Sequence, residues 1–298
     1  MAKKTSIGAW AFIWGGYAEA PIPLEKVVGR LAELKFDGVE LAAFPPHLDP
    51  KEYNTSAKRK KIKKLLDDNG LGVSGLAAPF PPPATTAPKE YLDVVKGHLD
   101  ICNDLEIPKL RVDTISPPTE IPGGMDYETC FKKIAEVWNR AAETCQDAGV
   151  KLVWEFEPGF LFNKPSEVVR MVEEVAHPNF SVLFDSCHAY MCSVIGARQL
   201  GEKETLPGGA VEFAEKLTGK IGHIHLIDSD GTLHDGETST HAPFGKGVLN
   251  FDEIMPAILK AGYTDAWWPI DLCFWPKAME VVAEAKAFVD DLIAKYGK

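Results

Sequence analysis

The sequence has no apolar run long enough for a membrane-spanning helix, which needs about 20 residues. It has no C-x-x-C pair, so neither a zinc ribbon nor a thioredoxin-type site is indicated. Its six cysteines are scattered, and free thiols in a reducing compartment, the cytoplasm, are the simplest interpretation. Basic residues are outnumbered by acidic ones, 32 to 43, and the net charge of -11 disfavours a nucleic-acid backbone as the main ligand.

Two hydrophobic patterns alternate along the chain. Short apolar segments typical of buried strands occur at residues 6–12, 38–41, 72–76, 109–112, 151–156, 180–184, 221–227 and 266–270. Segments with helical spacing follow them at residues 24–34, 56–68, 89–105, 127–148, 165–175, 210–217, 251–261 and 276–296. Eight such units predict an α/β fold, a (β/α)8 TIM barrel, as a single domain spanning residues 1–298. No G-x-G-x-x-G follows the first strand, which disfavours a doubly wound sheet.

The first strand has a competing interpretation. It resembles a secretory signal peptide, with two lysines (Lys3-Lys4), an apolar run through Trp14 and then Ala18-Glu19-Ala20. We interpret the segment as a strand, because cleavage after Ala20 would leave only seven strands. The connecting segments at residues 79–88 and 228–248 are predicted to be loops, the first rich in proline and the second polar and rich in glycine.

Polar residues stand where the predicted strands end, and in such a barrel the chemistry is found at these ends. They are Glu40 on strand two, Arg111 and Asp113 on strand four, Glu155 and Glu157 on strand five, Asp185 and His188 after strand six, His223 and His225 on strand seven, and Asp271 after strand eight. Carboxylates with an imidazole suit Mn2+, Mg2+, Co2+ or Zn2+ and are too rich in oxygen for a structural zinc site. Only one member of each closely spaced pair on strands five and seven need bind the metal.

These residues lie in motifs that resemble the sugar phosphate isomerase/epimerase superfamily, the xylose isomerase-like barrels. The motifs are residues 150–156 (VKLVWEF), the pair Asp185-x-x-His188, residues 222–226 (GHIHL) followed by Asp228, and residues 245–251 (GKGVLNF). The superfamily includes ketose 3-epimerases, inosose isomerases and dehydratases and, more distantly, apurinic endonucleases. The resemblance covers nearly the whole chain.

The resemblance implies one divalent metal ion, most simply Mn2+, held by Glu155, Asp185, His225 and Asp271. It implies that His188 binds substrate, and that the carboxylates of strands five and eight exchange a proton on a carbon next to a carbonyl. The superfamily usually has Glu on strand eight, whereas this chain has Asp271. A carboxylate shorter by one methylene weakens a mechanism with two symmetric bases.

These features predict a metal-dependent isomerase or epimerase of a sugar, keto-sugar or inosose that works through an enediolate. Glu155 is the candidate general base, and Glu157 is the second candidate. A lyase or dehydratase acting on a keto-sugar, inosose or 3-keto-glycoside is the alternative. A nuclease related to the apurinic endonucleases is disfavoured, because it needs histidines at the ends of strands three and four, where Ala77-Ala78 and Asp113 stand.

Further residues are candidates for substrate binding. Trp14 and Trp275 have rings that can cover a sugar. Arg111, His223 and Lys246 can bind hydroxyl or phosphate groups, although a salt bridge at the rim explains Arg111 and Lys246 equally well. The loop at residues 228–248 carries His241, which could reach the pocket. We expect a small sugar or cyclitol as the substrate, no nucleic acid or membrane partner, and a homodimer or homotetramer.

Overall fold

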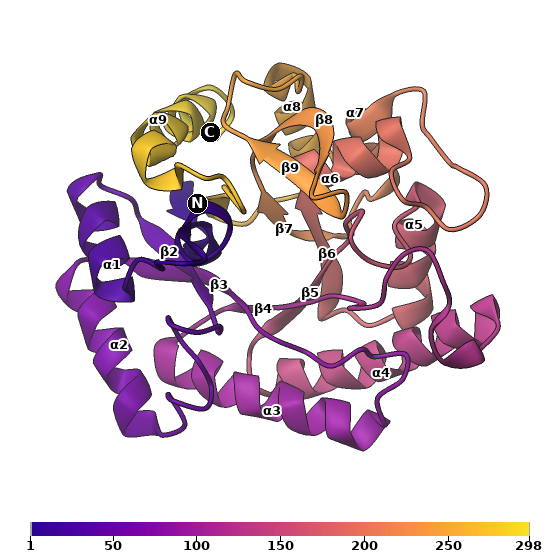
Figure 1. The fold of residues 1–298 in the computed structure, drawn as a ribbon, viewed down its shortest axis with the longest axis horizontal. Coiled ribbons are helices and arrows are strands. Elements are labelled where there is room, and N and C mark those ends of the chain that lie inside the picture. The colour runs from indigo at the N-terminus through magenta and orange to yellow at the C-terminus, as the bar shows by residue number, and fades with distance from the viewer. Residues whose placement is uncertain (1, 298) are drawn as a thin grey trace.

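Eight parallel strands form the centre of the fold in a computed structural model that describes residues 2–297 (Figure 1). Six of them pair in chain order as one sheet: β2 (Gly38–Ala42), β3 (Gly72–Ala77), β4 (Lys109–Val112), β5 (Lys151–Glu155), β6 (Phe180–Asp185) and β7 (Ile221–His225). The other two, β1 (Lys4–Ile7) and β10 (Trp267–Ile270), pair with each other. Single bridges join Gly8 to Glu40 and Leu226 to Ile270, so that the two groups of strands complete the barrel.

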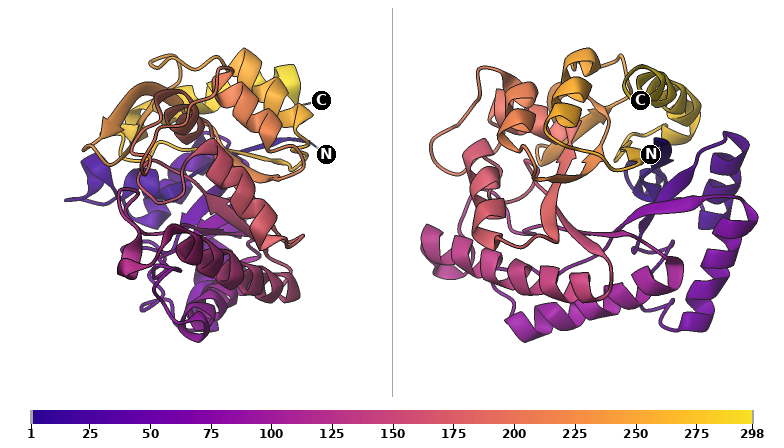
Figure 2. Two further views of the ribbon diagram at one scale, coloured as in Figure 1. Left: turned by 90° about the vertical axis from the view of Figure 1, so that its right-hand side faces the viewer. Right: turned by 180° about the vertical axis from the view of Figure 1, so that it is seen from behind.

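Helices surround the strands on the outside, as the views in Figure 2 show. The large helices are α1 (Leu24–Glu33), α2 (Ser56–Asp68), α3 (Pro88–Leu105), α4 (Tyr127–Asp147), α5 (Pro165–Val175), α7 (Gly209–Lys216), α8 (Phe251–Lys260) and α9 (Ala278–Tyr296). Each buries an apolar stripe against the barrel; in α4, for example, the Trp138 ring packs on Trp154 of β5 and Phe180 of β6. The predicted α/β barrel is confirmed. The predicted domain limits, residues 1 and 298, lie outside the described residues.

The first strand is shorter than predicted. β1 ends at Ile7, and residues Ala9–Phe12 form a 3-10 helix in place of the predicted end of the strand. The turn brings the Trp10 ring back over Gly8, where an added Cβ would lie 2.3 Å from the ring. Trp10 is therefore buried at the top of the barrel rather than continuing the strand. Among residues 2–297, none of the helices combines the length and apolar character that crossing a membrane requires.

The predicted loop at residues 228–248 contains an antiparallel hairpin, formed by β8 (Asp228–His234) and β9 (Thr238–Ala242). Its base is fixed by the Asp228 carboxylate, which accepts hydrogen bonds from the backbone N–H groups of Gly245, Gly247 and Leu249. The hairpin packs on the short helix α6 (Ser186–Tyr190) that follows β6. It thereby forms a wall above the ends of the strands, where the sequence pattern predicts only a loop.

Candidate metal centre

A cavity of about 560 Å3 lies at the carboxyl ends of the strands. Its floor includes Glu155, Glu157 and Asp271, and its walls are lined by aromatic rings and by the β8–β9 hairpin. Trp14 stacks on Phe274 and meets Phe44 edge-on, so one side of the cavity is an aromatic surface. A concave site with apolar walls and a few buried polar groups is typical of small-molecule binding.

Four potential metal ligands converge at the floor, one each from β5, β6, β7 and the end of β10. Ligand atoms of Glu155, Asp185, His225 and Asp271 all lie within 4.8 Å of one another, and the four side chains are buried. The His225 Nδ1 atom lies 2.8 Å from Glu155 Oε1 and 3.4 Å from Asp271 Oδ2. The strand ladder fixes these side chains on a rigid frame: Asp185 pairs with His225 of β7, and Glu155 pairs with Leu183, two residues before Asp185.

The donor set fits a divalent cation. Three carboxylates buried around one imidazole are costly without a compensating positive charge. The Asp185 Oδ2 atom is buried and has no hydrogen-bond partner within the described residues. Its other oxygen accepts the His188 backbone N–H at 2.7 Å, which leaves Oδ2 available for an ion.

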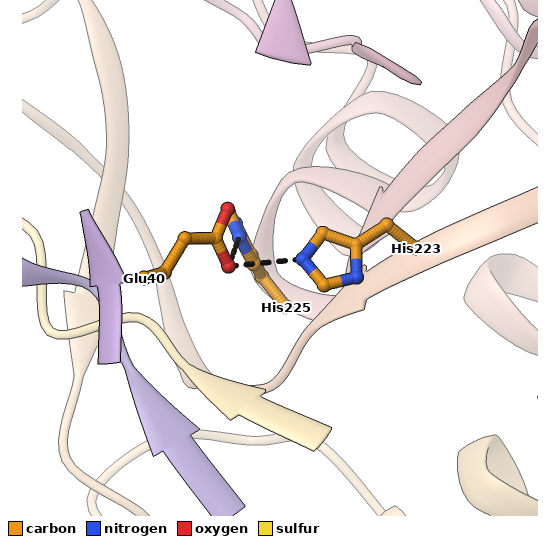
Figure 3. Close-up of side chains that lie close together, drawn as sticks. All are labelled: Glu40, His223 and His225. Carbon is orange, nitrogen blue, oxygen red and sulfur yellow. Dashed lines mark hydrogen bonds and ion pairs between the residues drawn. The ribbon is translucent and has the colours of Figure 1, made fainter. Parts of the chain in front are cut away.

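The orientation of His225 is set from its far side (Figure 3). Glu40 of β2 points its carboxylate at both histidines of β7: its Oε2 atom lies 3.2 Å from His225 Nε2 and 2.9 Å from His223 Nε2. If Nε2 of His225 carries the proton that Glu40 accepts, Nδ1 is the nitrogen left for the metal. The two histidines of the strand thus have different roles, with His225 in the cluster and His223 beneath it.

Arg111 holds the outer side of Glu155. Its guanidinium lies 2.8 Å from Glu155 Oε2 and 3.0 Å from Asp113 Oδ2, and it borders the cavity. Burial would raise the pKa of Glu155, but Arg111 and His225 outweigh it and lower that pKa to about 2. Glu155 is therefore a carboxylate in the metal-free protein, as a ligand or a base must be.

At pH 6, two of the four potential ligands hold protons in the metal-free protein. Burial raises the pKa of Asp185 to about 7. Burial would lower the pKa of His225, but the carboxylates of Glu40 and Glu155 hold it well above its usual value. Glu157, outside the cluster, behaves like Asp185: burial and the neighbouring Asp113 raise its pKa to about 8.

We expect the affinity for Mn2+ to decrease as the pH is lowered below about 7, because an ion must displace the protons of Asp185 and His225. Each displaced proton makes the apparent affinity change about tenfold per pH unit. Titration calorimetry at pH 6 in two buffers of different ionisation enthalpy would count the protons released. Binding that released none and was equally tight at pH 6 and pH 8 would contradict this protonation pattern.

Substitution of Glu40 by Gln should weaken Mn2+ binding by about 10- to 100-fold, the usual effect of removing a group that orients a metal ligand. The Gln keeps the shape but lacks the charge that fixes the proton on His225 Nε2. Ser74→Ala is the matched control, because the Ser74 hydroxyl lies 3.5 Å from the same Glu40 oxygen and bonds neither histidine. Equal Mn2+ affinities for Glu40→Gln and the parent would show that Glu40 does not position His225.

The structure brings many of the sequence-predicted site residues to one place. Glu157, His188, Arg111 and Trp14 all line the cavity, together with Glu155 and Asp271 of the cluster. Thr238 donates to Glu157, and Ser239 lies 2.8 Å from His188 Nδ1, so the hairpin positions both.

Three predicted substrate contacts lie elsewhere. His223 is fully buried against Glu40, inside the barrel rather than on the cavity wall, because it stands two residues before the strand end. Lys246 is exposed in the turn after β9 and is not among the residues that line the cavity. Trp275 borders a neighbouring hollow with Gly16 and His234. The structure therefore does not support these three as direct contacts of a molecule in the main cavity.

Three other residues contact the cluster in ways that the sequence did not predict, although His241 was expected to reach the pocket. Glu40 orients His225, and Trp10 donates its indole N–H to Asp271 Oδ1 at 2.7 Å. His241 of β9 is buried in the cavity wall, 3.4 Å from Asp271 Oδ1. The sequence contains no clear signal for the strand that carries His241, because residues 238–241 are all polar and show no apolar alternation.

The family model described as "Xylose isomerase-like TIM barrel" matches residues 28–290. The fructoselysine 3-epimerase of Escherichia coli O157:H7 is 22% identical over 262 residues, which cover 81% of this chain and 83% of that protein. The inosose dehydratase of Geobacillus thermodenitrificans is 22% identical over 273 residues, 84% of this chain and 82% of that protein. The crystal structure of the IolI protein with a zinc atom superposes with a TM-score of 0.76, at 17% identity, over 98% of this chain and 99% of that one.

Proposed function

The chain belongs to the xylose isomerase-like TIM barrel family, and from this membership we propose that it is a divalent-metal-dependent isomerase or epimerase of a keto-sugar or inosose. The observation that carries the proposal is the cluster of Glu155, Asp185, His225 and Asp271 at the floor of a cavity of sugar-binding size. The similarity to a 3-epimerase and an inosose dehydratase, both enzymes, supports the same class of chemistry.

The four clustered residues would hold the ion, with Mn2+ the first candidate. The IolI structure contains zinc, so Zn2+ is a second candidate. When bound, a divalent cation supplies a Lewis acid that favours negative charge on a substrate oxygen next to the reacting carbon. The remaining steps fall to the side chains of this chain.

Glu155 is the proposed base that takes the proton from the carbon next to the carbonyl. Its carboxylate lines the cavity and is kept ionised by Arg111 and His225. Glu157, two residues after Glu155 in the chain, borders the same cavity. It is the proposed group that returns a proton to the substrate. His188 and Arg111 would bind substrate hydroxyl groups, while the Trp14 ring would cover the apolar face of the sugar and exclude water.

A lyase or dehydratase is the second candidate, and the position of Asp271 favours it. One Asp271 oxygen accepts hydrogen bonds from the Trp10 indole at 2.7 Å and from the Cys273 backbone at 2.9 Å. The other oxygen faces His225. Asp271 is also one methylene shorter than the Glu usual at this position in the family, which draws its carboxylate back from the substrate, and loss of a β-hydroxyl or β-glycosidic oxygen needs only one base.

The test is to incubate the Mn2+-loaded protein with ketoses, inososes and 3-keto-glycosides in D2O and to follow products by NMR. An isomerase or epimerase places deuterium on a carbon while the substrate keeps all its oxygens. A lyase releases water or an alcohol. The metal site itself would be refuted if Glu155→Gln, Asp185→Asn and His225→Ala each bound Mn2+ as tightly as the parent.

We also propose a small sugar or cyclitol as the molecule that the protein binds, with no nucleic acid or membrane partner. The enclosed site and the net charge of -11 support this. A cytoplasmic location is supported by the six free cysteines, five of them buried. A homodimer or homotetramer is the expected assembly, and light scattering on the purified protein would test it.

A further inference from the structure

The β8–β9 hairpin reaches the metal centre through one side chain, His241. Figure 1 shows the hairpin beside α6 and the ends of β6 and β7. Within β9, Ser239 and His241 are buried, whereas Thr238 and Thr240 are half-exposed. The strand period therefore directs His241 inward, on the same side as Ser239, which contacts His188.

His241 lies against two of the four clustered residues. One ring nitrogen is 3.4 Å from Asp271 Oδ1, and the other is 4.0 Å from Asp185 Oδ1. Ligand atoms of His241, Asp185 and Cys187 also lie within 4.8 Å of one another. His241 thus borders the four-residue cluster through Asp185 and Asp271, on the side that faces the hairpin. It lies outside the 4.8 Å limit that joins the four, so its ring must shift to share one ion with all of them.

The polar atoms of His241 are buried without hydrogen bonds. Neither ring nitrogen makes a hydrogen bond among residues 2–297, although Asp271 Oδ1 lies 3.4 Å from one of them, and the residue is only 4% exposed. Asp185 Oδ2, in the same place, also lacks a partner. Buried polar groups are nearly always satisfied, so unpartnered atoms from two facing side chains point to a missing shared partner. A cation satisfies a carboxylate oxygen and an imidazole nitrogen at once.

We propose that His241 is a fifth metal ligand, supplied by the hairpin to the ion that Glu155, Asp185, His225 and Asp271 hold. The inference rests on the proposed metal-dependent function and extends it. Binding of the ion then fastens the hairpin to the barrel. Since the neighbouring Thr238 and Ser239 contact Glu157 and His188, the ion also sets the position of two residues that border the substrate.

The first test uses the parent protein alone. X-ray absorption spectroscopy on protein loaded with one equivalent of Zn2+ counts imidazole ligands through their multiple-scattering pattern. Two imidazoles, those of His225 and His241, are expected. A single imidazole would overturn the proposal, and this measurement needs no variant that folds.

The second test is His241→Gln, for which Mn2+ affinity should fall at least about tenfold, the lower end of the effect of disturbing a ligand shell. The visible spectrum of the Co2+-loaded variant should also change, because it reports coordination number. His234→Gln is the matched control: His234 is a histidine of the same hairpin that stacks on Phe274 and is outside the cluster. If His241→Gln left both the Mn2+ affinity and the Co2+ spectrum unchanged, His241 would not be a metal ligand.

Asp185→Asn separates failure of this inference from failure of the proposed function. Loss of Mn2+ binding in Asp185→Asn, together with unchanged binding in His241→Gln, would leave the four-residue centre standing without a fifth ligand. Stoichiometric binding by the parent that neither substitution weakened would remove the metal centre, and the inference about His241 with it.

Discussion

Glu155→Gln should lower the rate of exchange between the substrate C–H and solvent by about 100- to 10,000-fold, the range that a positioned general base contributes. Gln can occupy the same volume between Arg111 and His225, but it cannot take a proton. The measurement is deuterium incorporation by NMR with metal content determined on the same sample, so that slower exchange is not confused with lower metal loading.

Glu167→Gln is the control for loss of a buried glutamate. Glu167 is 7% exposed and accepts the Tyr127 hydroxyl on the outside of the barrel, away from the cavity. Its variant should exchange substrate protons at the parental rate. If Glu155→Gln retained the parental rate at full metal loading, the base would have to be another residue, and Glu157 is the next carboxylate at the cavity.

Mn2+ at 100 times its dissociation constant should stabilise the metal-free protein by about 2.7 kcal/mol, and Asp185→Asn should largely lose this effect. Without metal, the variant should also differ from the parent in its free energy of unfolding. The folded-state pKa of Asp185 is raised to about 7, so the native state binds more protons than the unfolded state between about pH 4 and pH 7. The free energy of unfolding therefore falls as the pH rises through that window, and above about pH 7 the whole of this decrease persists.

At pH 8 and without metal, Asp185→Asn should therefore be more stable than the parent, because the amide carries no charge to bury. It can still accept the His188 backbone N–H at the start of α6. Thermal unfolding with and without Mn2+ measures both effects. Asp126→Asn is the control, since Asp126 caps α4 in the same way but is exposed. A parental response to Mn2+ in Asp185→Asn would contradict the assignment.

The barrel and the four clustered residues could be predicted from the sequence, because both depend on local signals. A strand that is buried on both faces appears in the sequence as a short apolar run. A polar residue directly after such a run marks the strand end, as Asp185 does after residues 182–184. The order of parallel strands then places these ends side by side.

The contacts that the sequence did not predict depend on geometry that one sequence does not encode locally. Glu40 meets His225 across the barrel interior, and that contact depends on how strands far apart in the chain are staggered. Without the family resemblance the pair on β7 could not be divided, because His223 and His225 share a face and only their contacts distinguish them. Both meet Glu40, but His225 alone also meets the cluster. His241 depends on a hairpin whose glycines at residues 231 and 236 suggest a loop.

The junction between β7 and β10 is one of two places where a single bridge closes the barrel wall, the other being between Gly8 and Glu40. Only the Leu226–Ile270 bridge joins them, and Pro269 has no N–H to add to the ladder. His225 and Asp271 stand immediately beside this junction, one on each strand. An ion shared by them would act as a cross-link over the seam, as a disulfide does in a secreted protein. The centre would then assemble only in a closed barrel and would in turn resist its opening, so that metal retention reports the integrity of the fold.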